Sequence, residues 1–260
     1  MSNTGALSGR GAVVLGASAE GGTGWCIAQA LAAEGASVVV AARSESALDR
    51  LARQIHGSYL RCDASREEDV ANLADTATRR LGKVDVAVNC AFLPTLSLIE
   101  SIQDSVLQAS IQTNFAANVY FLKHMARAIG RDGSIVLFSS LASKRPILPH
   151  AIYASLKSAV DCLVRYAAVE LGPRNILVNS ILPGAIETPT SKPLLDLPGA
   201  REAILADVPL KRLATGLDYG RAVVWLASGN AFLTGCNLDI SGGNQLAQQN
   251  YPEIPASLRP

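Results

Sequence analysis

Short apolar runs alternate along this chain with longer stretches whose apolar residues recur at helical spacing. The apolar runs predict buried strands at residues 12–15, 37–41, 58–62, 84–89, 135–138, 176–181 and 237–240. The stretches between them predict helices at 25–34, 46–55, 67–81, 104–129 and 152–171. Because repeated strand–helix–strand units require right-handed crossovers, we expect an α/β fold with one doubly wound, mostly parallel seven-stranded sheet and helices on both faces.

No linker, repeat or low-complexity block interrupts this alternation. A length of 260 residues suits one large α/β unit, so we expect a single domain over 1–260. The region at about 185–215 contains Pro193 and Pro198 and predicts a mobile lid. The tail at about 246–260, with three prolines, is expected on the surface or against a neighbouring subunit.

Composition narrows the class of protein. A formal net charge of +1 gives no electrostatic reason to expect nucleic acid or an anionic membrane as a partner. No apolar run approaches the length of a membrane span, and the polar start does not resemble a signal peptide. The five cysteines are scattered and the three histidines lack metal-ligand spacing. We therefore expect a cytoplasmic protein with reduced thiols and without a metal site.

A glycine-rich turn joins the first predicted strand to the first helix. It runs Leu15-Gly-Ala-Ser-Ala-Glu-Gly-Gly-Thr-Gly-Trp-Cys-Ile27. Glycines let the backbone approach a pyrophosphate, and the helix that follows offers unpaired N–H groups and the positive end of its dipole. The turn therefore predicts a Rossmann-type dinucleotide site, although glycine-rich turns also occur without nucleotides.

The end of the second strand bears on the choice of cofactor. Folds that select NAD usually carry an acidic residue there, which binds the ribose 2′-hydroxyl. This chain has Ala42 followed by Arg43, and a basic residue favours the 2′-phosphate of NADP(H). We expect NADP(H) as the preferred cofactor, with NAD(H) possible; the alternative is that Arg43 is an ordinary surface residue.

Two further strand ends carry polar residues. Asp63, after the third strand, is a candidate for contact with the adenine edge, or else an N-cap for the helix that begins near Ser65. Asn89 closes the fourth strand and either braces the neighbouring strands and the cofactor or serves as a turn residue.

The segment from Ser139 to Lys157 carries the candidate catalytic chemistry. Tyr153 and Lys157 are four residues apart, so a helix places them on one face. A nearby ammonium stabilises tyrosinate, so we expect Lys157 to lower the pKa of Tyr153. Ser140 follows a strand at its carboxyl end, where open α/β sheets place ligand-facing groups. These three residues predict a general acid/base, a charged helper and a hydroxyl that orients a carbonyl.

Further candidates lie on both sides of this segment. Asn114 interrupts a long apolar helix: it is either a core amide with internal partners or a residue that bends the helix and holds a water near Lys157. After the sixth strand, the turn Pro183-Gly184 places a loop over the site. In that loop Thr188 either contacts the nicotinamide carboxamide or caps the next helix.

Together these residues resemble the short-chain dehydrogenase/reductase family from Gly11 to about Gly243. The ordered set Asn114, Ser140, Tyr153, Lys157 carries the resemblance. It implies that Tyr153 is the acid/base, that Ser140 polarises the substrate oxygen, that Lys157 binds the nicotinamide ribose, and that Asn114 anchors a relay water. It also implies a homotetramer or homodimer. The full set of expected cofactor contacts is Gly16, Ser18, Gly22, Thr23, Gly24, Arg43, Asp63, Asn89, Ala91, Tyr153, Lys157, Pro183, Gly184, Ile186 and Thr188.

The chain departs from the family pattern at two places. Leu15 replaces the usual threonine, and the glycine turn is two residues longer, like the turn of the related enoyl-acyl-carrier-protein reductases. Those enzymes, however, space their tyrosine and lysine more widely. The usual Asn-Asn-Ala-Gly after the fourth strand is Asn89-Cys-Ala-Phe92 here, so Phe92 narrows or reshapes the substrate mouth.

The leading hypothesis is an NADP(H)-dependent oxidoreductase that interconverts a carbonyl and a secondary alcohol. The alternatives are reduction of an activated carbon–carbon double bond in an enoyl thioester, and a nucleotide-binding protein without turnover. By analogy the pocket is lined by apolar side chains, so we expect a largely apolar small-molecule substrate that contacts Phe92, Leu141, His150 and Leu194. His150 is a candidate for a polar contact or an ordinary loop histidine.

Overall fold

The computed structural model describes residues 5–229 and 232–246, and a seven-stranded sheet runs through this part of the chain. All six strand pairs are parallel, and the strand order is β3-β2-β1-β4-β5-β6-β7. The doubly wound α/β fold is therefore confirmed. The strands are β1 (Gly11–Leu15), β2 (Ser37–Ala42), β3 (Ser58–Arg61), β4 (Val86–Asn89), β5 (Gly133–Phe138), β6 (Ile176–Pro183) and β7 (Asn237–Ile240).

The strand order reverses between β1 and β4. The chain builds outward from β1 to β3 and then crosses back, so that β4 pairs with the other side of β1. In this pairing Leu15 lies opposite Asn89, at the carboxyl ends of both strands. Helices leave these two strands on opposite faces, which opens a crevice where parallel α/β sheets bind their ligands.

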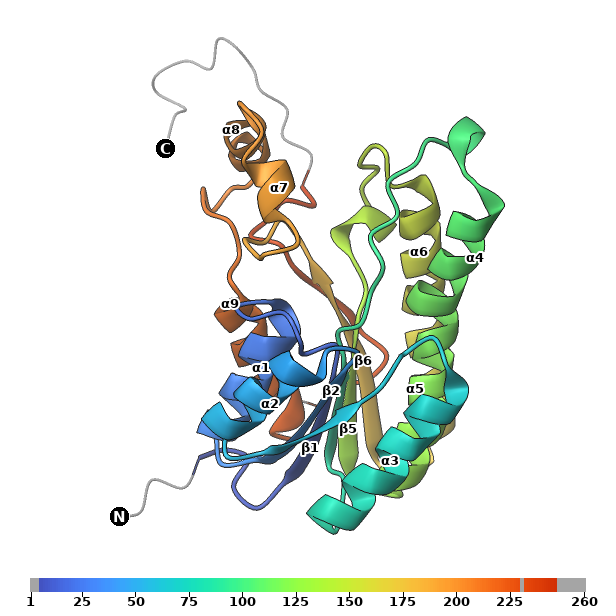
Figure 1. Cartoon of the computed structure of the whole chain (residues 1–260), viewed down its shortest axis with the longest axis vertical. Helices are drawn as coiled ribbons and strands as arrows, with labels where there is room; N and C mark the ends of the chain where they lie inside the picture. The colour runs from blue at the N-terminus through green and yellow to red at the C-terminus, as the bar shows by residue number, and fades with distance from the viewer. Residues whose placement is uncertain (1–4, 230–231, 247–260) are drawn as a thin grey trace.

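Helices cover the sheet in two layers (Figure 1). On one face lie α1 (Thr23–Ala33), α2 (Glu45–Gln54) and α9 (Gly216–Ala227). On the other lie α3 (Glu67–Leu81), α4 (Asp104–Ile111), α5 (Ala117–Ile129) and α6 (Ala151–Leu171). The short helices α7 (Lys192–Leu195) and α8 (Ala200–Ala206) stand beyond the carboxyl ends of the strands.

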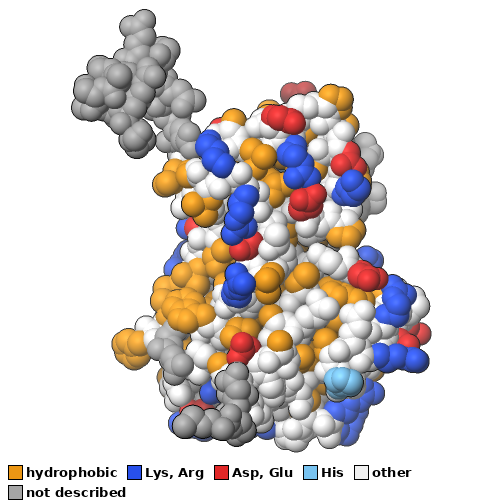
Figure 2. Space-filling model, turned by 90° about the vertical axis from the view of Figure 1, so that its left-hand side faces the viewer, with side chains coloured by type: hydrophobic (Ala, Val, Ile, Leu, Met, Phe, Trp, Pro, Cys, Tyr) orange, Lys and Arg blue, Asp and Glu red, His pale blue; other side chains and the backbone are white. Residues whose placement is uncertain are grey.

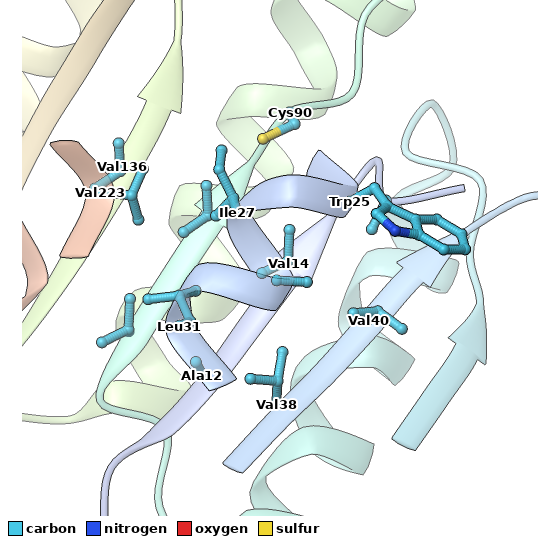
Figure 3. Packing of buried hydrophobic residues seen from close by; sticks show 14 of the residues in the cluster. Ala12, Val14, Trp25, Ile27, Leu31, Val38, Val40, Cys90, Val136 and Val223 are labelled. Carbon is cyan, nitrogen blue, oxygen red and sulfur yellow. The ribbon is translucent and has the colours of Figure 1, made fainter. Parts of the chain in front are cut away.

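The sheet is buried on both faces because alternate residues of each strand face opposite layers. Ala12 and Val14 of β1 belong to the cluster that includes Ile27 and Leu31 of α1 and Val223 of α9 (Figure 3). Val13 and Leu15 belong to the second cluster, with residues of α3, α5 and α6. Burial of each large apolar side chain contributes about 1.5–3 kcal/mol, which is why these strands are nearly continuous apolar runs.

The predicted helix at 104–129 is interrupted. Between α4 and α5 the backbone forms a π-helical turn, Gln112–Ala116, that contains Asn114. A π turn inserts one extra residue into a helix and changes its direction. Asn114 therefore lies where the helix departs from regular α geometry.

Helix α9 was not predicted from the sequence. Two of its residues, Gly216 and Gly220, are poor helix formers and hide the periodic pattern. The structure explains them: a Cβ added at Gly216 would lie 2.5 Å from the Cys26 sulfur, and one added at Gly220 would lie 2.8 Å from the Ala30 Cβ. A capping box between Thr215 and Asp218 starts the helix despite the glycines.

The expected lid region at 185–215 contains α7 and α8 and is tied to the rest of the molecule at several points. Ile186 forms a parallel bridge with Ala214, which closes the base of the region. Arg145, in the segment between β5 and α6, forms a salt bridge with Asp207 and donates to the backbone oxygen of Asn244. We use the name clasp for the contacts of Arg145 with Asp207 and Asn244.

Some expectations concern residues or groups outside these elements. The predicted C-terminal tail lies outside the described residues except for Leu246, which is exposed. In the described ranges, no helix combines the length and the apolar character that crossing a bilayer requires. Over those same ranges, no group of three or more potential metal ligands is gathered.

Candidate active site

Helix α6 carries two of the candidate catalytic residues one turn apart. The Lys157 ammonium lies 5.5 Å from the centre of the Tyr153 ring. The Tyr153 hydroxyl hydrogen-bonds with the Ser140 side chain, which comes from the segment after β5. The structure thus brings Ser140, Tyr153 and Lys157 together, as the sequence predicts.

Lys157 is a buried cation. Its side chain is 1% exposed, and its Nζ donates a hydrogen bond to the backbone oxygen of Phe138 at 2.8 Å. Burial lowers the pKa of Lys157 to about 8, and its electrostatic interactions with Cys90 and Asp161 act in the opposite direction. The ammonium form is therefore only moderately favoured at neutral pH.

Burial has the opposite effect on Tyr153. It raises the pKa of the phenol to about 12, while the hydrogen bond from Ser140 favours the phenolate. The net shift of the Tyr153 pKa is therefore upward and not downward as predicted, because burial outweighs the groups that favour the phenolate. The physical reason is that both groups are desolvated, and that the ammonium directs its hydrogen bond to Phe138.

Ser140 is held at the start of a short turn. Its hydroxyl oxygen accepts a hydrogen bond from the Ala142 N–H at 3.1 Å, which begins the 3-10 turn Leu141–Ser143. The preceding Ser139 donates to the backbone oxygen of Lys157 at 3.1 Å. These bonds fix the end of β5 against α6, so the Ser140 hydroxyl faces the tyrosine.

Asn114 is a fully buried amide that holds the segment after β4. Its Oδ1 accepts from the Leu93 N–H at 3.0 Å, and its Nδ2 donates to the Leu93 oxygen at 2.9 Å. The Nδ2 group also donates to the Ser110 hydroxyl at 3.0 Å. Internal partners therefore satisfy the side chain, as the structural alternative expects.

A second amide, Asn118, extends this network to the strand end. It donates to the backbone oxygen of Asn114 at 2.9 Å and accepts from Asn89 Nδ2 at 3.0 Å. Asn89 in turn accepts from the Ala91 N–H at 3.0 Å. Asn118 is not among the residues predicted from the sequence, although its four-residue spacing from Asn114 within an apolar helix is a usable signal.

The glycine turn closes on the end of β4. Gly16 has a φ of +90°, and a Cβ there would lie 2.6 Å from the Ala91 nitrogen. A Cβ at Gly24 would lie 2.4 Å from the Gly16 oxygen. Only glycine allows this approach, so the requirement for glycine at both positions is geometric.

The start of α1 fits a phosphate group. Gly22 is the N-cap residue, and within the described part of the chain no side chain caps its first turn. The first turn also lacks an acidic residue, so its N–H groups and dipole remain available to an anion. Ser18 and Thr23 are partly exposed beside this helix end.

Arg43 and Asp63 lie near each other at the ends of β2 and β3. Arg43 is exposed, and Ala42 before it is buried. The Asp63 carboxylate accepts from the N–H and the hydroxyl of Ser65 at 3.0 and 2.7 Å. Burial raises the pKa of Asp63, but these bonds and the Arg43 charge outweigh it and lower the pKa overall. Asp63 therefore caps the turn before α3.

The segment after β6 enters the region of α7. A Cβ at Gly184 would lie 2.7 Å from the Ser241 Cβ, so glycine is required where Pro183-Gly184 passes the last strand. Thr188 Oγ1 accepts from the Ser191 N–H at 3.2 Å. This bond lies in the turn before α7, whose N-cap residue is Ser191 and whose first turn has no side-chain cap among the described residues, so both interpretations of Thr188 stay predictions.

The predicted substrate contacts differ in exposure. Phe92 is 45% exposed and Leu194 is 52% exposed, whereas Leu141 is buried. The His150 ring meets the Tyr153 ring edge to face, with centres 6.1 Å apart. His150 Nδ1 is buried and finds no hydrogen-bond partner among the described residues.

Two surface hollows lie away from these residues. One, of about 830 Å³, is lined by residues beside β3 that include Arg53, His56 and Arg80. The other, of about 460 Å³, runs between α5 and α6 and includes Val119 and Tyr166. No candidate catalytic residue lines either hollow, and the carboxyl ends of the strands locate the candidate site instead.

A doubly wound parallel sheet with this glycine turn and this Ser–Tyr–Lys cluster defines a dinucleotide-dependent oxidoreductase. A family model described as Enoyl-(Acyl carrier protein) reductase matches residues 16–245. The chain belongs to the short-chain dehydrogenase/reductase family.

Characterised relatives share most of this chain. L-xylulose reductase of Bos taurus is 33% identical over 91% of this chain and 97% of its own length. The 7alpha-hydroxysteroid dehydrogenase of Escherichia coli K12 is 32% identical over 91% and 94%, respectively. The chain is thus an enzyme of the carbonyl–alcohol oxidoreductase type, from a family that binds NAD(P).

Solved structures confirm the fold. A short-chain type dehydrogenase/reductase from Mycobacterium ulcerans superposes with a TM-score of 0.88 at 28% identity, over 92% of this chain and 90% of that one. A short-chain dehydrogenase from Burkholderia cenocepacia in complex with NADP gives a TM-score of 0.86 at 26% identity, over 92% and 99%.

Proposed function

We propose that this enzyme is an NADP(H)-dependent oxidoreductase that interconverts a carbonyl and a secondary alcohol on a largely apolar small molecule. The observation that carries the proposal is the convergence of Ser140, Tyr153 and Lys157 at the carboxyl ends of the strands. When bound, the nicotinamide cofactor supplies or accepts the hydride.

The side chains divide the remaining work. Tyr153 donates a proton to the carbonyl oxygen during reduction and removes it from the alcohol during oxidation. Ser140 donates a hydrogen bond to the same oxygen and orients it. Lys157 binds the ribose of the nicotinamide half and stabilises the tyrosinate. Asn114 positions the segment after β4 beside the cofactor through its bonds to Leu93.

The preference for NADP(H) rests on the end of β2. Arg43 is exposed there and no carboxylate occupies position 42, so a 2′-phosphate meets attraction rather than repulsion. The related Burkholderia cenocepacia dehydrogenase was solved with NADP, which supports the proposal.

The apolar substrate is inferred from two groups of exposed residues. Phe92, Ile147 and Leu148 lie on the segments that follow β4 and β5. Leu194, Leu197 and Leu210 lie on the region of α7 and α8 and are all more than half exposed. Both groups lie beyond the carboxyl ends of the strands. The relatives named above are a sugar reductase and a hydroxysteroid dehydrogenase. An apolar lining favours a large apolar ketone, such as a steroid, over a sugar.

Turnover of contrasting substrates tests the proposal. NADPH oxidation is measured with a steroid ketone, with L-xylulose and with a conjugated enoyl thioester, each with wild type and Tyr153→Phe. We expect the steroid ketone to react fastest and Tyr153→Phe to lose about 10²–10⁴-fold in kcat while binding NADPH normally. Full activity of Tyr153→Phe contradicts the assignment of the acid/base.

A second candidate function is reduction of the carbon–carbon double bond in an enoyl thioester. The description of the matching family model and the lengthened glycine turn both favour it. The four-residue spacing of Tyr153 and Lys157 favours the carbonyl reaction instead. Faster turnover of the enoyl thioester than of every ketone replaces the first proposal with the second.

We further propose a homotetramer built on two apolar faces. Val119, Tyr166 and Val169 are exposed on α5 and α6, beside the groove between these helices. On the opposite layer Leu217 and Trp225 of α9 are about half exposed, and Phe232 is fully exposed. Figure 2 shows hydrophobic side chains gathered on the face that contains α1 and α9. Two separate apolar faces suit an assembly with two kinds of interface.

A further inference from the structure

A buried carboxylate follows the catalytic candidates along α6. Asp161 is 7% exposed and lies four residues after Lys157, which itself lies four after Tyr153, so the three share one face of the helix. Its Oδ2 accepts from the Ser143 hydroxyl at 2.7 Å. Its Oδ1 is buried and has no hydrogen-bond partner among the described residues. Burial of a carboxylate costs free energy unless an opposite charge nearby compensates the loss of hydration.

Asp161 is connected to the turn that carries Ser140. Ser143 ends the 3-10 turn that begins after Ser140, and besides donating to Asp161 it accepts from the Ser158 hydroxyl at 3.1 Å through its backbone oxygen. Asn237 of β7 donates to the backbone oxygen of Asp161 at 3.1 Å. The carboxylate therefore lies where the Ser140 turn, α6 and β7 meet.

Several charged or titratable groups face Lys157 from the surrounding elements. Tyr153 and Asp161 lie on α6, and Cys90 follows β4. The backbone oxygen of Phe138, the last residue of β5, accepts the hydrogen bond of the lysine. Burial raises the pKa of the Cys90 thiol, which keeps it neutral. On Asp161 itself, Arg165 donates to the backbone oxygen at 3.0 Å. Among the described residues that act on Lys157, Asp161 is the one carboxylate.

We propose that Asp161 is a positioning residue: its carboxylate stabilises the Lys157 ammonium, and its bond with Ser143 holds the turn that presents Ser140. The inference rests on the proposed function, because the charge on Lys157 matters only if Tyr153 exchanges a proton with substrate. It adds a fourth residue, which carries a second charge, to the Ser–Tyr–Lys cluster.

The charge and the hydrogen bond are separated by two variants. Asp161→Asn removes the charge and keeps an oxygen that accepts from Ser143, whereas Ser143→Ala keeps the charge and removes the bond. Glu170→Gln, an exposed carboxylate on the same helix, is the matched control. The Lys157 side chain is followed by NMR of ¹³C-lysine in the cofactor-free protein, with its signal assigned by its loss in Lys157→Met.

We expect Asp161→Asn to lower the Lys157 pKa by about one unit, and Ser143→Ala and Glu170→Gln to leave it unchanged. In alcohol oxidation the rising limb of the pH–kcat profile then moves to higher pH in Asp161→Asn. A smaller fraction of Lys157 is protonated in this variant, so the tyrosinate is less stabilised and the pKa of Tyr153 is higher. Ser143→Ala lowers kcat at every pH without moving the limb.

An unchanged Lys157 pKa in Asp161→Asn overturns the inference, and so does an equal shift in Asp161→Asn and Ser143→Ala. If Asp161→Asn does not fold, Asp161→Ser, which also removes the charge and keeps an oxygen, replaces it in the same measurement, and an unchanged Lys157 pKa in that variant overturns the inference. The NMR result stands even if no ketone is turned over, so failure of the proposed function is recognised separately.

Discussion

Tyr153 and Lys157 illustrate how burial prepares a proton-transfer pair. Both side chains lose water, and each is pushed toward its neutral form: the pKa of the phenol rises to about 12 and that of the ammonium falls to about 8. The pair therefore needs compensating groups, which are Ser140 for the phenolate and Asp161 for the ammonium.

This cost gives a prediction about stability. The pKa of Lys157 falls from 10.5 to about 8 on folding, which corresponds to a cost of about 3 kcal/mol while the lysine is charged in both states. Lys157→Met is expected to raise the free energy of unfolding at pH 7 by roughly 1–3 kcal/mol and to abolish turnover.

The sign of its pH dependence follows from the two pKa values. Between pH 8 and 10.5 the unfolded chain binds more protons at Lys157 than the folded chain, so wild-type stability from this group rises with pH. The gain in the free energy of unfolding of Lys157→Met over wild type is therefore complete below pH 8 and decreases as the pH approaches 10.5. Denaturant unfolding of both proteins across this range measures it; an advantage that does not vary with pH contradicts the prediction.

Arg43 is expected to decide between the two nicotinamide cofactors. Arg43→Asp replaces attraction for a 2′-phosphate by repulsion and should weaken NADPH binding about tenfold to hundredfold, with NADH little affected. Fluorescence titration with both cofactors measures the change, and Arg53→Asp, another exposed arginine on the same side of the sheet, is the control. Equal weakening of NADPH and NADH binding rules out the phosphate contact.

At the scale of elements, the packing of α9 on α1 depends on glycine, and the π turn between α4 and α5 depends on side-chain amides. Neither follows from the hydrophobic pattern. Helix α9 packs against α1 through Gly216 and Gly220, where a methyl group has no room. The π turn between α4 and α5 is accompanied by the amides of Asn114 and Asn118, which bond to neighbouring backbone.

The close contact of α1 with α9 is tested by adding one methyl group. Gly220→Ala should lower the free energy of unfolding by about 1–3 kcal/mol, because its Cβ meets the Ala30 Cβ at 2.8 Å. Gly172→Ala is the control, since no described atom lies within 4 Å of the added Cβ and its φ is negative. Urea unfolding of the two variants compares them; equal stabilities would show that the helices separate without cost.

The sequence predicts most of the fold because each buried strand is an apolar run and most helices are amphipathic. It predicts the Ser140, Tyr153 and Lys157 cluster because helical spacing and strand ends place them. It does not predict α9, since Gly216 and Gly220 mask the pattern. Nor does it reveal Asp161 or Asn118, whose roles depend on partners far away in the chain, Ser143 and Asn89. The direction of the Tyr153 pKa shift depends on burial, which spacing alone does not report.

For the whole molecule, the two apolar faces predict the assembly. Val169→Glu on α6 and Trp225→Glu on α9 should each reduce the proposed tetramer to a dimer, and the double variant should be a monomer. Light scattering after size-exclusion chromatography measures the masses, with Glu68→Gln, an exposed carboxylate on α3, as the control. A monomeric wild type contradicts the proposed tetramer.

The clasp formed by Arg145 joins the segment after β5 to the region of α8 and to Asn244. It lies at the surface, so dissolved ions compete with it, and its strength falls as their concentration rises. If the region of α7 and α8 must move before product leaves, the clasp slows product release, and salt weakens this effect. Ionic strength would then set the rate of the slowest physical step without changing the chemistry of hydride transfer.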